Sequence, residues 1–478
     1  MGQSVSSGTF FLMVSELSFI LSNYIIHIGL AWYLGPEAYG IFGVLTSLYL
    51  INRSFLNTGL PRAVSKFLSE FPDKAGSILR TSSRIQWIIT LIFALFYLGF
   101  APTLAWILHD ESLTYYIMFL GLMVIPLGLL SLYTSGFLNG LHLFREQAYV
   151  KTAYPLFRLL FTFVLVIAGW ALWGALVGYF LGIILALLWS MFLLRKTNKE
   201  RPTAAFPWKK IISFALPVTI GSLAFTLLRN MNVLFLKAIL GDNYLVGLYT
   251  AAYTLSTATY MIFLSLPLTL TPAISRALAK KDLEKVRRYG RESVRYLLLL
   301  LLPITAFIAA TAPELLNLFY SPAYQSAGEV LILLTVSSAF LSVFATLGAL
   351  VTGGGHPQKE MYWTILLTAA LAGLNMLLIP RYGMIGSAWA SLIAAFLALL
   401  LVGKFVYTRY GITWPWSSLL RIGATAALIF IFAFFWHYSG LALIINFMVL
   451  GVVYLTLLYL FGEFGRREVN LIRGIFHR

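Results

Sequence analysis

The stretch Ile85–Ile107, IQWIITLIFALFYLGFAPTLAWI, decides the fold class of this protein. It contains no Asp, Glu, Lys or Arg, and about 20 mainly apolar residues suffice for a helix to cross a bilayer. Stretches such as Tyr296–Phe319 and Ile422–Trp436 approach or reach this length. They recur along the whole chain of 478 residues, so we expect an all-α integral membrane protein with about fourteen transmembrane helices.

Composition supports this class. The chain is 60% hydrophobic and 11% charged, whereas soluble domains carry roughly 25% charged residues. Met1–Gly8 lacks a basic region, so no removable signal peptide is predicted. The absence of cysteine excludes disulfides and thiol chemistry.

The distribution of basic residues predicts the topology. The predicted crossings are 10–34, 38–60, 84–108, 113–138, 153–169, 171–194, 211–240, 245–270, 293–319, 325–352, 361–380, 383–407, 418–437 and 441–462. Most Lys and Arg residues lie in every second connection and in the C-terminal tail. Basic loops stay in the cytoplasm, so we expect a multi-pass plasma-membrane protein with both termini cytoplasmic. The net charge of +17 then reflects topology and anionic membrane lipids, with no nucleic acid partner.

The sequence also indicates an internal duplication. Leu34-Gly35 followed by Tyr39–Phe42 returns, about 206 residues later, as Leu240-Gly241 followed by Val246–Tyr249. Six crossings per copy predict two parallel repeats with a cavity between them, and two further C-terminal helices. The predicted domains are an N-terminal lobe at 1–194, a cytoplasmic linker at 195–210, a C-terminal lobe at 211–410, and helices thirteen and fourteen with a cytoplasmic tail at 411–478.

Two arginines lie inside apolar segments, one in each half: Arg53 and Arg229. A cation at membrane depth costs about 2.5–3.5 kcal/mol on insertion scales, and it normally faces a protein interior or a wet cavity. The pair therefore predicts a positive cavity for an anionic substrate. Alternatively, either arginine is a structural lock that pairs with a carboxylate or with backbone carbonyls.

Polar side chains near these arginines are candidates for binding substrate: Asn23, Tyr24, His27, Asn52, Asn230 and Asn232. Glu16, Asn23 and His27 share one helical face. Glu16 either neutralises Arg53 or carries a coupling H⁺ or Na⁺, the only cofactor considered, and no metal site is predicted. His27 is alternatively a packing residue.

Two other cations have simpler interpretations. Lys237, near the outer end of its helix, would extend its amine to the interface. Arg158, placed close to the cytoplasmic interface, would anchor the chain there.

Three motifs resemble the polysaccharide (O-antigen type) transporter family of the multidrug/oligosaccharidyl-lipid/polysaccharide exporter superfamily. They are Leu34-Gly35-Pro36-Glu37-Ala38-Tyr39-Gly40-Ile41-Phe42, Val246-Gly247-Leu248-Tyr249-Thr250-Ala251-Ala252-Tyr253 and Gly383-Met384-Ile385-Gly386-Ser387-Ala388. The resemblance implies a flippase, not an enzyme, that moves an oligosaccharide linked to polyprenyl phosphate or pyrophosphate from the inner to the outer leaflet. It implies alternating access of two lobes around a basic cavity, with glycan-assembly enzymes as candidate partners and no particular oligomeric state.

Two other functions are weighed against this one. An H⁺- or Na⁺-coupled multidrug exporter of the same superfamily would need an acidic, aromatic site, and only Glu16 fits it. A membrane glycan polymerase or ligase would need a sizeable outer loop, whereas every predicted outer loop is short.

Overall fold

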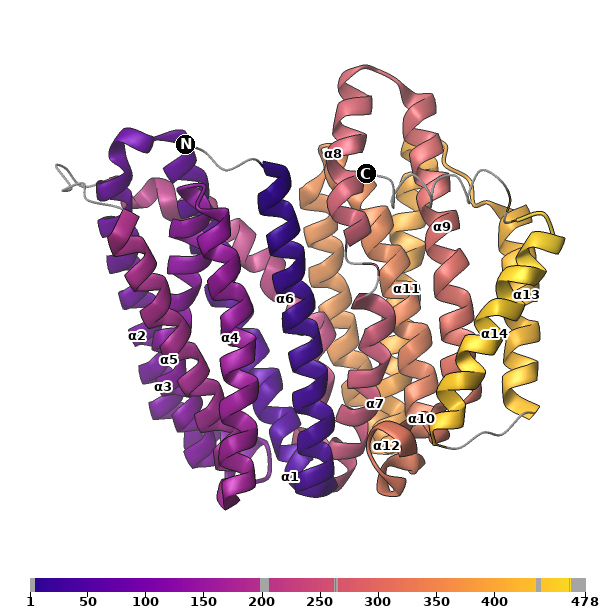
Figure 1. The fold of residues 1–478 in the computed structure, drawn as a ribbon, viewed down its shortest axis with the longest axis horizontal. Helices are drawn as coiled ribbons and strands as arrows, with labels where there is room; N and C mark the ends of the chain where they lie inside the picture. Colours follow the sequence, from indigo (N-terminus) through magenta and orange to yellow (C-terminus); the bar gives the residue numbers. More distant parts are fainter. Residues whose placement is uncertain are drawn as a thin grey trace. The chain divides into compact units, whose positions relative to one another are not determined.

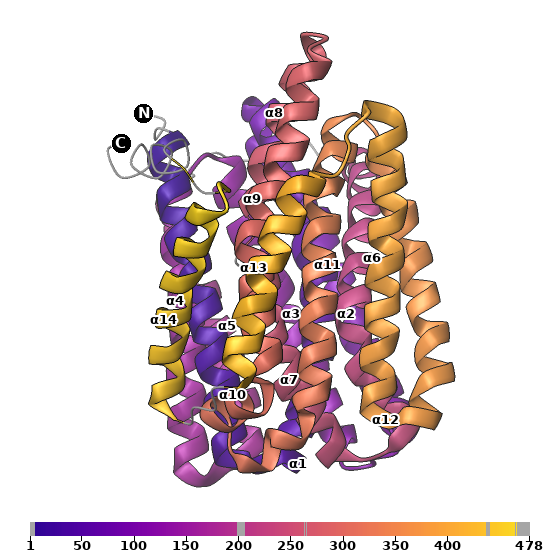
Figure 2. The same cartoon turned by 90° about the vertical axis from the view of Figure 1, so that its right-hand side faces the viewer.

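The computed structural model describes residues 5–197, 206–261, 263, 265–435, 440–463 and 465. Within these ranges all regular structure is helical, which confirms the all-α class (Figures 1 and 2). The elements are α1 Val5–Glu70, η1 Pro72–Lys74, α2 Ala75–Ile107, α3 Leu113–Ser131, η2 Leu132–Leu138, α4 Phe144–Leu165, η3 Val166–Trp170, α5 Ala171–Thr197, α6 Trp208–Leu240, α7 Asn243–Met261, α8 Ser265–Ala279, α9 Leu283–Ala310, α10 Ala312–Phe319, η4 Pro322–Ala327, α11 Gly328–Gly353, α12 Pro357–Tyr410, α13 Trp416–Phe435 and α14 Leu441–Leu460.

Among the described residues, eleven helical stretches are long and apolar enough to cross a membrane. Three of them, of 57, 52 and 54 residues, exceed twice the length of about 20 that a crossing needs. Each is interrupted by a glycine with positive φ: Gly35 at 74°, Gly169 at 92° and Gly383 at 58°. A side chain would strain the backbone in that region. The interruptions fall where the sequence predicts one crossing to end and the next to begin, and the total of fourteen stays a prediction.

The chain divides into two compact units, Met1–Gly247 and Leu248–Arg478. Helix α6 belongs to the first unit, where it packs against α1, although the sequence assigns it to the second lobe. The lobes 1–194 and 211–410 therefore stay a prediction. Half of the predicted linker 195–210, and the tail beyond 465, lie outside the described residues.

In the first unit, α4 and α5 pack backbone to backbone through a row of glycines on α5. An added Cβ would lie 2.8 Å from the carbonyl carbon of Leu165 at Gly174, 2.4 Å from Thr162 N at Gly178, and 2.8 Å from Arg158 N at Gly182. Small residues spaced by four let helix backbones approach closely in membranes. The glycine row therefore fixes the position of α4.

The duplicated motifs contact each other reciprocally. A Cβ added at Gly40 would lie 1.9 Å from the backbone oxygen of Asn243, and one at Gly247 would lie 2.0 Å from that of Pro36. Since Pro36 and Gly40 correspond to Asn243 and Gly247 in the repeat, the two contacts are the same contact seen from either copy.

In the second unit, α11 packs against α8, α9 and α12, and α13 packs against α9 and α14 (Figure 2). Apolar residues of α9, α13 and α14 form one buried cluster that includes Leu299, Ile422 and Leu450. Arg295 of α9 also pairs with the buried Glu463, just beyond α14, at 2.6 Å. The two C-terminal helices are thus attached to α9.

Candidate functional site

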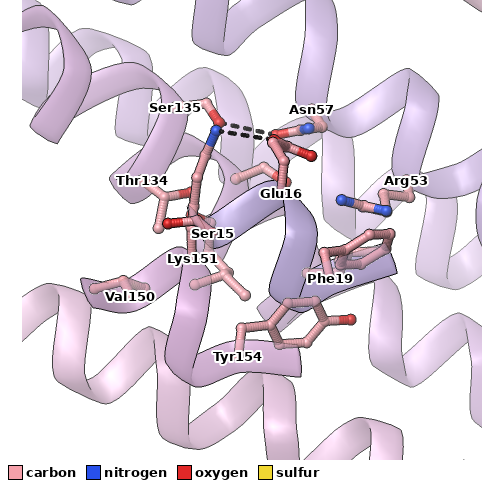
Figure 3. Close-up of a pocket in the computed structure, with 13 residues that line it drawn as sticks. Ser15, Glu16, Phe19, Arg53, Asn57, Thr134, Ser135, Val150, Lys151 and Tyr154 are labelled. Atoms are coloured by element: carbon pink, nitrogen blue, oxygen red, sulfur yellow. Dashed lines mark hydrogen bonds and ion pairs between the residues drawn. The ribbon is translucent and has the colours of Figure 1, made fainter. Parts of the chain in front are cut away.

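A polar cavity of about 90 Å³ lies within the first unit, between α1, α4 and the α3–η2 segment (Figure 3). It has room for several water molecules or one compact anionic group. It is lined by Ser15, Glu16, Phe19, Arg53, Asn57, Leu127, Leu130, Ser131, Thr134, Ser135, Val150, Lys151 and Tyr154. Arg53 and Glu16 are the residues of the sequence-predicted site that it contains.

Arg53 lies in the second half of α1 and reaches back to the first half. Its Cζ is 4.1 Å from the centroid of the Phe19 ring, a cation–π contact worth about 0.5–2 kcal/mol. Asn57, one turn further on, accepts a hydrogen bond from Ser135 Oγ at 3.1 Å. Among the described residues, no carboxylate forms an ion pair with Arg53. The structure therefore does not support the alternative in which Arg53 is locked in place by a carboxylate.

Glu16 pairs with Lys151 of α4. The Nζ–Oε1 distance is 3.8 Å, and the side chains of Lys151 and Glu16 are 32% and 64% exposed. Figure 3 shows this pair beside the Asn57–Ser135 hydrogen bond, with Arg53 on the other side of Glu16. The structure thus replaces the predicted neutralisation of Arg53 by Glu16 with a Glu16–Lys151 pair. Because the cavity lining contains two cations and one carboxylate, it is positively charged overall.

A third cation lies behind the cavity. Arg158 of α4 is 1% exposed, and its Nη2 donates to Asn23 Oδ1 at 3.4 Å. Its Cζ lies 5.1 Å from the ring centroid of Phe19 and 4.7 Å from that of Tyr179. Its Nε is buried with no hydrogen-bond partner among the described residues. Arg53 and Arg158 therefore share the Phe19 ring.

The prediction that Arg158 anchors the chain at the interface is wrong. The sequence placed the start of this helix at residue 153, but α4 begins at Phe144. Arg158 therefore lies about four turns inside the helix, surrounded by protein. The charged residues of the first two turns of α4 lie in a loop of the predicted topology and in a helix of the structure.

The other predicted residues of the first half do not line the cavity. His27 is buried, with Nδ1 3.0 Å from the Tyr39 hydroxyl and its ring against Phe42, which is the geometry of a packing residue. Asn52 is buried and accepts a hydrogen bond from Tyr97 at 2.9 Å. Tyr24 is half-buried on α1.

Helix α6, which carries the predicted site residues Arg229, Asn230 and Asn232, packs against α1. Thr226 Oγ1 donates to Ser54 Oγ at 2.7 Å, so the helix that carries Arg229 adjoins the one that carries Arg53. Arg229 is half-buried and lies one turn beyond Thr226, outside the cavity lining. Asn230 and Asn232 are buried, and Asn230 donates to the carbonyl of Thr226 on its own helix.

Sequence reasoning missed Lys151, Asn57 and Ser135. Asn57 stands four residues after Arg53, and Lys151, Tyr154 and Arg158 are spaced three and four apart. Such spacings place side chains on one helical face. With α4 beginning at Phe144, these spacings indicate the site.

Lys237 does not extend to an interface, which corrects that prediction. Its side chain is 1% exposed and pairs with Asp110 at 3.2 Å, while Nζ also donates to the Gly241 carbonyl. Burial raises the pKa of the Asp110 carboxyl, but hydrogen bonds from Ser112 and Asn243 and the charge of Lys237 outweigh it. The pKa of Asp110 therefore lies below its ordinary value.

Asp110→Asn is expected to destabilise the protein by about 2–5 kcal/mol near neutral pH, because it leaves a buried ammonium without its counter-charge. A depressed folded-state pKa stabilises the fold above the ordinary carboxyl value of about 3.9, and this contribution is lost as the pH falls through the folded value. The difference from wild type should therefore shrink below about pH 4. Thermal unfolding in detergent at several pH values measures it, with the exposed Asp73→Asn as control. If Asp110→Asn is less stable than wild type by the same amount at all pH values, the loss of stability does not come from the ion pair.

The chain resembles proteins of one family over more than half its length. The sequence profile described as polysaccharide biosynthesis protein matches residues 5–278, and the MatE profile matches residues 217–380. Stage V sporulation protein B of Bacillus subtilis is 23% identical over 434 residues, which cover 84% of this chain and 83% of that protein. The probable low-salt glycan biosynthesis flippase Agl15 of Haloferax volcanii is 22% identical over 277 residues, 55% of this chain and 56% of Agl15.

Two solved structures share the fold. The lipid II flippase MurJ in an inward closed conformation aligns with a TM-score of 0.76 and 14% identity, over 94% of this chain and 99% of MurJ. An inward-facing multidrug resistance MATE family transporter of the MOP superfamily aligns with a TM-score of 0.70 and 17% identity, over 80% and 94%. At these identities the likeness establishes the fold alone.

Proposed function

Because the chain belongs to the polysaccharide biosynthesis protein family, we propose that it is a flippase for an oligosaccharide linked to polyprenyl phosphate or pyrophosphate. The family resemblance read from the sequence is confirmed by the matching profile. In our proposal the chain acts as a multi-pass membrane transporter and not as an enzyme. The proposal concerns the substrate and the direction of its movement, from the inner to the outer leaflet.

The positive cavity is the observation that carries this proposal. Arg53 and Lys151 line it, and Glu16 is the single carboxylate among its lining residues. Guanidinium and ammonium groups bind phosphate oxygens by charge-assisted hydrogen bonds. In our proposal these two cations hold the phosphate, while the lipid tail stays in the bilayer.

The rest of the lining suits a glycan. Asn57, Ser135 and Thr134 present amide and hydroxyl groups, and Phe19 and Tyr154 present aromatic rings. Sugars need both hydrogen-bond partners and flat apolar surfaces. We propose that the first sugar residues lie against these side chains, and that Arg229, Asn230 and Asn232 on the adjoining α6 contribute a second group.

The transport cycle in this proposal is alternating access of two lobes in the plasma membrane, with both termini in the cytoplasm. A coupling H⁺ or Na⁺, with Glu16 as its carrier, remains part of the hypothesis. Glycan-assembly enzymes are the partners that such a flippase would meet.

A multidrug exporter is the second candidate, favoured by the MatE match over residues 217–380. An organic cation would need an excess of carboxylates at its site. The cavity of the first unit has the opposite balance of charge, which favours the flippase.

Transport by the purified protein in liposomes distinguishes the two functions. We expect it to transfer a fluorescent oligosaccharide on polyprenyl pyrophosphate between leaflets about 10- to 100-fold faster than the same glycan on a neutral lipid. This ratio corresponds to one or two charge-assisted hydrogen bonds. A membrane-impermeant quencher measures the transfer, and ethidium uptake tests for an exporter. Ethidium transport without transfer of the phosphorylated substrate would refute the flippase.

A further inference from the structure

The Glu16–Lys151 ion pair forms part of the lining of the positive cavity. Both side chains line it, and Glu16, 64% exposed, is far more open to solvent than Lys151 at 32%. Figure 3 shows the carboxylate between Lys151 and Arg53. An anion of the protein itself therefore occupies the place between the two cations of the cavity.

Neighbouring hydrogen bonds keep this anion near Lys151. Ser15 Oγ donates to the carbonyl of Ala148 at 3.1 Å, and Thr152 Oγ1 donates to Ser15 Oγ at 3.0 Å. These bonds join α1 to α4 next to both members of the pair. The backbone around Glu16 is thus held against α4, while its side chain stays mostly exposed.

The pair itself is weak enough to exchange. Exposed ion pairs contribute about 0–1 kcal/mol, and 3.8 Å lies near the upper limit for one. A phosphate that contacts both cations at once would gain more, because hydrogen bonds to charged groups are worth about 1.5–3 kcal/mol each. A neutral headgroup gains nothing that could replace the carboxylate.

We propose that Glu16 is a built-in competitor of the substrate's phosphate: its carboxylate pairs with Lys151 in the empty cavity and is displaced when a phosphate binds Lys151 and Arg53. This inference rests on the proposed function and adds a selectivity device to it. Specificity is a difference of affinities that often includes a repulsive element. Glu16 supplies that element against headgroups with too little negative charge to displace it.

Binding of decaprenyl pyrophosphate to the detergent-purified protein tests the proposal. Glu16→Gln should tighten binding about fivefold at low salt, because it removes a competing exposed ion pair, and the gain should fall as salt screens it. Lys151→Met should weaken binding, and adding Glu16→Gln to that variant should give a smaller gain than in wild type. Glu16→Asp, which keeps the charge but is one methylene shorter, should bind with an affinity between those of wild type and Glu16→Gln.

Control variants and ligands show whether the change in binding comes from the charge of Glu16, and whether failure would concern the competitor or the proposed function. Glu70→Gln and Lys74→Met, exposed residues outside the cavity, should leave binding unchanged, and binding of neutral decaprenol should not respond to Glu16→Gln. Binding of inorganic pyrophosphate is measured in parallel. If Glu16→Gln tightens its binding as much as that of decaprenyl pyrophosphate, the site recognises the phosphate alone. If only decaprenyl pyrophosphate binds more tightly, the lipid must present the phosphate. Unchanged or weaker binding by Glu16→Gln, alongside clear binding by wild type, would overturn the competitor alone. No binding of decaprenyl pyrophosphate by either protein would overturn the proposed function and the competitor with it.

Discussion

Arg53→Gln is expected to lower the transfer of lipid-linked oligosaccharide by about 10- to 100-fold, with little change in stability. The loss corresponds to the one or two charge-assisted hydrogen bonds that the guanidinium would make to phosphate. Stability should change by less than about 1 kcal/mol, because no carboxylate among the described residues loses an ion-pair partner. The loss of the Phe19 contact is the main structural cost. Leaflet transfer in liposomes and thermal unfolding in detergent measure the two effects.

Two further variants make this result specific. Arg80→Gln removes an exposed arginine of α2 outside the cavity and should transfer substrate like wild type. Arg53→Lys keeps the charge but loses the planar fork, so it should fall between wild type and Arg53→Gln. A fall in stability of about 3–5 kcal/mol in Arg53→Gln would instead identify a structural lock.

Gly178→Ala is expected to destabilise the protein by about 1–3 kcal/mol, the usual cost of overpacking, and to reduce substrate transfer as well. The new methyl group would lie 2.4 Å from the backbone nitrogen of Thr162 and 2.6 Å from its Cα. Since these are backbone atoms of α4, the helix must move away from α5. Lys151 and Tyr154 of the cavity are carried on α4, so the cavity would change shape with it.

Gly99→Ala is the matched control for this prediction. Gly99 is also a helical glycine, on α2, but an added Cβ would meet nothing within 4 Å. Alanine favours a helix over glycine by about 0.8–1 kcal/mol, so this variant should be as stable as wild type or slightly more so. Thermal unfolding of both variants side by side checks the prediction. Equal stability of the two would show that the α4–α5 approach is not tight.

The sequence predicted the helices and their turns well because both are local properties. A run of apolar residues predicts a membrane helix wherever it packs, and Gly35, Gly169 and Gly383 occupy the positive-φ turns between predicted crossings. The family followed from short motifs at such turns. The sequence does not predict the start of α4 at Phe144, because its first turns contain charged residues, which are typical of loops. Only the packing of these turns against other helices shows that they are helical.

The residues of the site were predicted only in part. Arg53 was found because a cation in an apolar segment is expensive in every fold. The pairings of the polar side chains were not predicted: Glu16, for which neutralising Arg53 was one of two expected roles, pairs with Lys151, and Asn23 accepts a hydrogen bond from Arg158.

By itself the sequence determined the membrane class, the helical segments, the turns and the family, because hydropathy and the conformational freedom of glycine act residue by residue. The tertiary structure decided which polar side chains share a cavity and which anion opposes which cation. Polar residues do share helical faces, as Lys151, Tyr154 and Arg158 do, but their spacing does not say which side chains of a neighbouring helix they will meet. The close approach of α4 and α5 at glycines such as Gly178 is a contact between separate segments, so it is visible only in the packed structure.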